Sequence, residues 1–185
     1  DNFSGNTFGH WSGHNIGFTT QLSAAICALV LGEESGHPDW ERYVDLGRDM
    51  CRQYARWGLD PHGFSYEGTG YGSIPIHFIY LYAYLLLQNG RENLFASLPV
   101  LREIPNATFQ MLFPDCSNLA QISDLATPGE LPWLLLTAKQ FNRPQDIDLW
   151  YRYKQGQDMS TKHVYRGNLL ALLWLDDAMP RQAVE

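Results

Sequence analysis

The chain has 185 residues, 45% of them hydrophobic and 14% aromatic, which is enough apolar material for one ordinary hydrophobic core. Its formal net charge of −7 argues against a nucleic-acid partner. The three cysteines, Cys27, Cys51 and Cys116, are too few and too widely spaced for a disulfide framework or a zinc knuckle. We expect Cys27 and Cys51 to be buried thiols, and we expect neither a metal nor a cofactor.

Helical patterns dominate the chain. Residues 1–15 read as loop, and residues 92–113 read as a helix that Pro99 and Pro105 interrupt. Asp39 is expected to cap the second helix. Apolar residues at helical spacing predict further helices over residues 18–31, 39–57, 74–88, 130–141, 144–154 and 165–178. No strand pattern is present, so the sequence predicts an all-α fold.

The predicted helices come in pairs joined by short turns. In each pair one helix is amphipathic and its neighbour is apolar on most faces, which is typical of stacked helical hairpins. About three hairpins are present, whereas a closed (α/α) toroid of six hairpins needs roughly twice this length. We therefore expect one incomplete toroid domain over residues 1–178, with residues 179–185 as the start of a linker. The longest apolar run, residues 79–87, is too short to span a bilayer, so no membrane partner is expected.

A glycine-rich loop separates two of the helical patterns. Residues 63–73 (GFSYEGTGYGS) contain four glycines, two tyrosines and one carboxylate. Because glycine disfavours the helix interior, we expect these residues to form a loop that holds a phenol and a carboxylate at the mouth of the scaffold. A second polar and aromatic segment, residues 8–17 (FGHWSGHNIG), runs directly into a helix. The two segments are predicted to form two walls of one site.

Four segments in order resemble those of heparinase II/III-like and oligoalginate lyases. Asn15 precedes a helix ending in LVLGE, and residues 63–71 are similar to a Gly-x-Tyr-x-Glu-Gly-x-x-Tyr segment. Residues 113–117 (FPDCS) are similar to a Phe-Gly-Asp-Ser loop, and the final LLWLDD stretch resembles the exit from the toroid. The resemblance implies a toroid followed by a β-sandwich beyond the C-terminus of this chain. It also implies β-elimination of an anionic polysaccharide or oligosaccharide that contains uronic acid, in the periplasm or outside the cell.

The resemblance implies a role for each matched residue. Asn15 corresponds to the residue that neutralises the uronate carboxylate, and Tyr71 to the tyrosine that protonates the leaving glycosidic oxygen. A histidine often serves as base in these enzymes, and His14 is the candidate here. The sequence departs from the family pattern at two positions, because Ile16 stands where many members have histidine and Gly72 where tryptophan is usual. The identity of the base is therefore open.

Each of these residues also has an ordinary structural interpretation. Asn15 would serve well as a helix N-cap, Tyr71 as a packed loop aromatic and His14 as a loop histidine. His10 and His14 have the i, i+4 spacing of metal ligands on a helix, but the glycines among them argue against a helix and a zinc site.

Further substrate-binding candidates lie in the same two segments. They are His10, Trp11, Tyr66 and Glu67. The aromatic rings would stack on sugar rings or simply close the top of the scaffold. Glu67 is expected to accept backbone hydrogen bonds that shape the loop, and Asp115 is expected to cap a turn.

Two other functions compete with a lyase. A glycoside hydrolase would need a pair of carboxylates, for which Glu67 with Asp60 or Asp115 are candidates. A non-catalytic glycan-binding or scaffold domain is the other alternative. The basic residues between 139 and 166 would form an anion-binding patch or a solvated helix face. An exposed apolar flank is expected where the rest of the toroid, or a second copy of the chain, would pack.

Overall fold

The computed structural model describes residues 15–120, 122, 131–156, 170–171, 173–175, 179–180 and 182. Within these residues the fold is all-α, as predicted, and the only extended pairings are isolated bridges between Leu59 and Ser65 and between Leu112 and Leu119. The elements are α2 (Asn15–Leu31), the 3-10 turn η1 (Gly32–Ser35), α3 (Trp40–Trp57), α4 (Gly68–Tyr71), α5 (Ser73–Gln88), α6 (Leu94–Ser97), α7 (Val100–Met111), α8 (Trp133–Phe141) and α9 (Pro144–Gly156).

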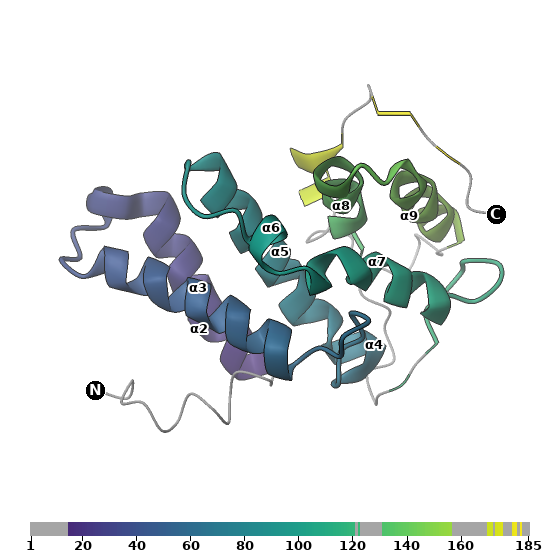
Figure 1. Cartoon of the computed structure of the whole chain (residues 1–185), viewed down its shortest axis with the longest axis horizontal. Helices are drawn as coiled ribbons and strands as arrows, with labels where there is room; N and C mark the ends of the chain where they lie inside the picture. The colour runs from purple at the N-terminus through teal and green to yellow at the C-terminus, as the bar shows by residue number, and fades with distance from the viewer. Residues whose placement is uncertain are drawn as a thin grey trace.

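The helices form an array of hairpins (Figure 1). α2 and α3 pack side by side at one side of the array, and α2 also packs against α5. α8 and α9 form a second hairpin on the other side, where α5 and α7 both contact α8. The predicted pairing of helices is therefore present, while closure into a toroid stays a prediction.

Helix α5 is the centre of the core. Its pattern is apolar nearly all round, and Ile79, Tyr80, Tyr82 and Leu86 are fully buried. Gly47 of α3 allows the neighbouring helices to approach closely, because a Cβ there would lie 2.5 Å from the Ala25 Cβ. The buried faces of α2, α3 and α5 therefore meet in one cluster.

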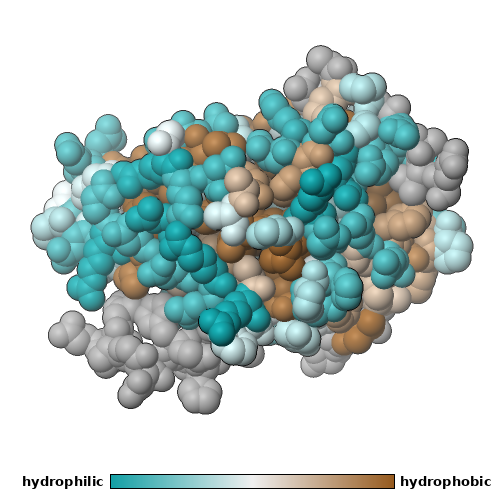
Figure 2. Space-filling model, viewed as in Figure 1, coloured by the Kyte–Doolittle hydropathy of each residue, from teal (hydrophilic) through white to brown (hydrophobic). Residues whose placement is uncertain are grey.

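Helix α3 has one buried face and one charged face, as its amphipathic pattern predicts. In Figure 2, hydrophilic residues cover the part of the surface over this helix. A bidentate pair joins Arg91 to Glu41 at 2.8 Å, and Nη2 of Arg52 donates to both carboxylate oxygens of Glu92 at 2.7–2.8 Å. These pairs tie α3 to the turn after α5.

Helix α2 differs from two details of the prediction. It begins at Asn15 rather than at residue 18, and Cys27 is exposed while Cys51 is buried. Cys27 shares an exposed stripe with Ile16 and Leu31, which are 64% and 49% exposed. This stripe lies on the side of α2 turned away from the core, because the opposite side packs on α3 and α5. The sequence predicts an exposed apolar flank, and packing of further helices or of a second copy on this stripe stays a prediction.

The start of α3 also differs from the prediction. Asp39 does occupy the N-cap position, but its side chain makes no capping hydrogen bond. Its backbone carbonyl accepts from the amides of Arg42 and Tyr43, and its own amide donates to Nδ1 of His37 at 3.1 Å. The turn before the helix, rather than the carboxylate, therefore fixes this helix start.

Two stretches, Asn15–Ser35 and Gly68–Gln88, are long and apolar enough to cross a membrane by length and composition alone. The second is 56% buried and contains the core helix α5, whereas the first is 33% buried. Core helices of soluble proteins meet the same criterion, so this is weak evidence for a membrane segment.

Helix α7 runs without interruption through Pro105, which corrects the predicted break; Pro99 does separate α6 from α7. A proline inside a helix removes the amide that would bond the carbonyl four residues earlier, here that of Leu101. The buried hydroxyl of Tyr80 donates to this carbonyl instead. A side chain from α5 therefore replaces the missing backbone donor, which the local sequence could not show.

We expect Tyr80→Phe to lower the free energy of unfolding by about 2 kcal/mol, because it leaves the buried Leu101 carbonyl without a donor. In a Pro105→Ala background the amide of residue 105 supplies that donor, so the same substitution should have less than about half the effect. Urea unfolding of the wild type, the two single variants and the double variant gives the coupling free energy between Tyr80 and Pro105. Equal effects of Tyr80→Phe in both backgrounds would contradict this account.

Candidate functional site

The glycine-rich loop connects α3 to α5 and is shaped by Asp60. Its Oδ1 accepts from the amides of His62 and Phe64 at 2.9 and 2.8 Å. Among the described residues, the predicted hydrogen bonds from backbone amides to the Glu67 carboxylate are not present, and Asp60 accepts such bonds instead. Oε2 of Glu67 is buried and has no hydrogen-bond partner in the described part of the chain. Asp60 performs the turn-forming role because it stands directly before the turn, where a short carboxylate reaches the next amides.

Two glycines let the loop lie against its neighbours. Gly63 has φ +86°, and a Cβ there would come within 2.5 Å of the backbone nitrogen of Ile104 in α7. A Cβ on Gly72 would lie 2.3 Å from Oγ of Ser65. The loop is less irregular than predicted, since Gly68–Tyr71 forms the short helix α4. This turn is stable because the surrounding packing, rather than intrinsic propensity, holds it.

A chain of contacts links the start of α2 to the loop. The Phe18 ring lies 4.6 Å from that of Tyr54, and the Tyr54 hydroxyl is 3.2 Å from Oγ of Ser65. Phe18 is less than one helical turn from Asn15. Burial raises the pKa of Tyr54, so its phenol stays neutral and is a structural link rather than a proton donor. The structure thus brings Asn15 and the loop to one end of the scaffold.

Of the three predicted catalytic residues, the structure describes Asn15 and Tyr71. Asn15 is buried, and its Oδ1 accepts from the amide of Ile16 at 2.6 Å. Tyr71 is partly buried at the end of α4, and its hydroxyl makes no hydrogen bond to any described residue. His14, His10 and Trp11 lie outside the described residues.

The other predicted contacts are placed as follows. Tyr66 is 67% exposed, so its ring is available for stacking. Asp115 does cap a turn, because its Oδ1 accepts from the amide and hydroxyl of Ser117, and these bonds lower its pKa. Thr69 donates to the Ala120 carbonyl at 2.8 Å and so ties the loop to this second turn.

His77 is a candidate that sequence analysis missed. It lies one turn into α5, and its Nδ1 is 2.8 Å from the Ser73 carbonyl, which accepts only, so Nδ1 carries the hydrogen. Burial lowers the pKa of His77 to about 4, so the ring is neutral at neutral pH and Nε2 keeps a lone pair. The only signal in the sequence was a histidine one helical turn after the end of the glycine-rich loop.

This histidine makes stability depend on pH. Between pH 6.5 and 4 the unfolded chain binds a proton that folded His77 excludes, so stability is lost as pH falls through this range. We expect His77 to account for about 3 kcal/mol of this loss. His77→Asn keeps a donor for Ser73 but does not titrate. Urea unfolding at several pH values should show a shallower acid dependence for this variant, and parallel curves would contradict the prediction.

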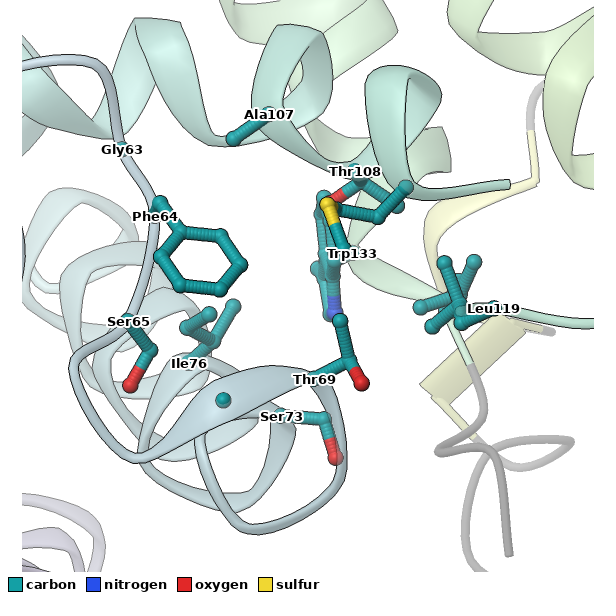
Figure 3. A pocket seen from close by; sticks show the side chains of 13 residues that line it. Gly63, Phe64, Ser65, Thr69, Ser73, Ile76, Ala107, Thr108, Leu119 and Trp133 are labelled. Carbon is teal, nitrogen blue, oxygen red and sulfur yellow. The ribbon is translucent and has the colours of Figure 1, made fainter. Parts of the chain in front are cut away.

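An open cleft of about 570 Å³ lies beside the loop. Its wall combines residues of the loop and of α7 with Ile122. The loop contributes Asp60, His62 and Phe64, and α7 contributes Glu103, Asn106, Ala107, Gln110 and Met111. A smaller recess of about 30 Å³ shares Phe64, Ala107 and Met111 with this cleft and extends beneath the loop towards Trp133 (Figure 3). Glu103 is a carboxylate that sequence analysis did not select, because only the fold brings α7 to the loop.

The predicted basic patch is partly neutralised. Arg143 pairs with Asp146 at 2.9 Å and Arg152 with Asp148 at 2.8 Å. Burial raises the pKa of Asp146, against the opposing effect of Arg143. Lys162 and Arg166 lie outside the described residues. Among the residues that the structure describes, no group of three acidic, histidine or cysteine side chains is placed to hold a metal ion.

Comparison with protein-family models, with curated proteins and with solved structures finds no match for this chain. Any assignment of function therefore depends on the motifs and on the geometry of the loop.

Proposed function

We propose that this chain is the helical part of a polysaccharide lyase that cleaves a uronic-acid-containing glycan by β-elimination. The order of the motifs supports the proposal, together with one structural observation. The contacts from Phe18 through Tyr54 to Ser65 bring Asn15 and the tyrosine-bearing loop to one end of the scaffold. The elimination needs a group that neutralises the carboxylate and a group that protonates the leaving oxygen of the same sugar, and Asn15 and the tyrosine of this loop are proposed for these two tasks.

The reaction assigns a task to each group. The amide of Asn15 donates to the uronate carboxylate and so makes the neighbouring C5 proton more acidic. A base removes this proton, a double bond forms between C4 and C5, and the bond from C4 to the glycosidic oxygen breaks. The phenol of Tyr71 gives its proton to the leaving oxygen. The base is His14 or the Tyr71 phenolate. His77 is the weaker candidate, because a pKa lowered to about 4 makes its Nε2 a poor acceptor for the C5 proton.

The partners follow from the reaction. The substrate is an anionic polysaccharide or oligosaccharide, and amide, phenol and imidazole groups supply the chemistry without a cofactor. Such a glycan lies outside the cytoplasm, so the proposed location is periplasmic or secreted. The flank of α2 around Ile16, Cys27 and Leu31 is where a further hairpin or a second copy would pack.

The experiment is a cleavage assay. The protein is mixed separately with alginate, heparan sulfate, hyaluronan and chondroitin, and the ultraviolet absorbance of the new unsaturated uronate is recorded. The proposal predicts growth of this absorbance with at least one glycan. New reducing ends without absorbance would indicate a hydrolase, and retention of glycan without either product would indicate a binding domain.

Asn15→Ala should reduce the rate of elimination about a hundredfold, because it removes the donor to the carboxylate. Its effect on the free energy of unfolding should stay near 1 kcal/mol, the usual loss at a helix start. Thr19→Ala is the matched control, since the Thr19 hydroxyl donates to the Asn15 carbonyl at 2.7 Å. If the two variants lose stability and activity in the same proportion, Asn15 is only a structural residue.

A glycoside hydrolase is the second candidate, and one observation favours it. Asp60 and Glu103 both line the open cleft, whereas the sequence predicts Glu67 with Asp60 or Asp115 as the pair. The Asp60 Oδ1 is already engaged by the loop amides, and Glu103 accepts from Asn106 at 2.9 Å. A hydrolase predicts that Glu103→Gln abolishes turnover, whereas the lyase proposal predicts that it leaves the elimination step intact.

A further inference from the structure

The recess beneath the glycine-rich loop has mainly apolar walls. Phe64, Ile76, Met111, Leu119 and Leu131 contribute to them, and Figure 3 shows Phe64, Ile76 and Trp133 around the same space. Its volume of about 30 Å³ corresponds to roughly two water molecules. Because Phe64, Ala107 and Met111 also line the open cleft, a ligand in the cleft can extend a small group into the recess.

One hydrogen-bond donor in the recess has no described acceptor. Trp133 is 1% exposed, and its Nε1 is buried without a partner among the described residues. In Figure 3 this nitrogen lies at the end of the indole ring on the side of Thr69 and Ser73. The ring stacks on Tyr80 at a centroid distance of 5.5 Å and an interplanar angle of 4°, so the N–H direction is fixed.

Three of the four hydroxyl groups that line the recess, those of Thr69, Ser73 and Thr108, donate to the carbonyls of Ala120, Gly70 and Ile104, respectively, at 2.7–2.9 Å. The fourth, that of Ser65, lies 3.2 Å from the Tyr54 hydroxyl, and either oxygen can be the donor of this pair. Their oxygens can still accept a hydrogen bond. The recess therefore offers one fixed donor, several acceptor oxygens and an apolar wall.

These features select the chemistry of the group that fits. A carboxylate or a sulfate would lose its hydration without gaining a cation, since no lysine or arginine lines the recess. An acetamido group matches it: the carbonyl accepts from Trp133, the N–H donates to a hydroxyl oxygen, and the methyl group packs on the apolar wall. A sugar ring then occupies the cleft, where Asp60 and Glu103 would repel a second anion but accept bonds from neutral hydroxyls.

We propose that the recess binds the acetamido group of an N-acetylated sugar, with its ring in the open cleft. This rests on the proposed function insofar as the ligand is taken to be a uronate-containing glycan. It narrows the substrate class to glycans in which an N-acetylhexosamine adjoins the uronate. The uronate then lies beside Asn15 and Tyr71 in the proposed arrangement.

The test follows the indole N–H of Trp133 by proton–nitrogen NMR. The Tyr71→Phe chain is used so that the ligand stays intact, and the Trp133 signal is assigned from its loss in Trp133→Phe. The probes are a hyaluronan tetrasaccharide, which carries acetamido groups, and an alginate tetrasaccharide, which does not. Trp150 and Trp174 are internal controls, because their buried Nε1 atoms also lack a described partner but do not line the recess.

The proposal predicts that the hyaluronan probe shifts the Trp133 signal, leaves those of Trp150 and Trp174 in place, and binds about tenfold more tightly than the alginate probe. Ala107→Leu, which fills the recess from α7, should remove the preference for the hyaluronan probe and bring the two affinities together. A Trp133 signal that does not move on saturation with hyaluronan, or that moves equally with both probes, would overturn the proposal.

The result is independent of cleavage. If the hyaluronan probe shifts the Trp133 signal as predicted but the wild-type protein forms no unsaturated product with any glycan, the acetamido site stands and the lyase assignment fails. If elimination occurs on alginate and Trp133 responds to neither probe, the lyase stands and the acetamido site fails.

Discussion

Tyr71→Phe should lower the rate of β-elimination about a thousandfold, because the leaving oxygen then receives no proton from the loop. The substitution removes the hydroxyl oxygen of a partly buried residue at the end of α4, and this oxygen makes no hydrogen bond within the described part of the chain. The fold should therefore be unchanged, and glycan binding should stay within about a factor of two. Initial rates of absorbance growth and a binding titration on the same preparations measure both effects.

Tyr66→Phe is the matched control for this experiment. Tyr66 lies in the same loop and is 67% exposed, so its phenol has no assigned part in the reaction. This variant should keep most of its activity. Loss of activity in both variants would point to the loop as a whole, and full activity of Tyr71→Phe would remove Tyr71 from the mechanism.

Gly63→Ala should lower the free energy of unfolding by about 3 kcal/mol. Two effects add: a left-handed backbone at φ +86° disfavours any side chain, and the new Cβ meets the backbone of Ile104 at 2.5 Å. Backbone atoms of α7 cannot move aside as a flexible side chain would. The loop must then lift from α7, which also widens the recess and displaces Phe64.

Gly36→Ala separates these two effects. Gly36 has φ +65°, but nothing lies within 4 Å of a Cβ there. Only the cost of the left-handed backbone applies, so this substitution should lower the free energy of unfolding by about 1 kcal/mol. Urea unfolding compares the two variants directly. Similar losses in both would mean that the close approach of the loop to α7 contributes nothing to stability.

Helix periodicity predicted the fold class and most helix positions. α5 is a clear case, because an apolar pattern on nearly every face requires burial on nearly every side, and α5 lies at the centre of the core. α3 is another, with its buried face and its charged face both visible in the sequence. Local pattern sufficed for these helices because burial alone decides their orientation.

Features that depend on tertiary contacts were not predictable. Pro105 was expected to break a helix, and only the fold shows that Tyr80 supplies the missing donor. Cys27 was expected to be buried because its neighbours are apolar, yet it lies on the outer face of α2. Helical periodicity identifies an apolar helix but does not say which of its faces has a neighbour.

The candidate site was partly predictable. The glycine-rich composition located the loop, and the resemblance selected Asn15 and Tyr71, whose catalytic roles stay proposals. The cleft and the recess could not be predicted, since Glu103, Ala107 and Trp133 reach the loop from helices that are distant in sequence. The turn-forming carboxylate was assigned to Glu67 rather than to Asp60 because the sequence does not show which amides each side chain reaches.

The most direct measurement of the central claim is the mass of the cleavage products formed in water enriched in heavy oxygen. Elimination breaks the glycosidic bond without adding water, so a lyase predicts an unsaturated product that carries no oxygen from the solvent. The account predicts this product from the wild-type chain and its loss in Tyr71→Phe. Products that are saturated and carry one solvent oxygen would show hydrolysis and contradict it.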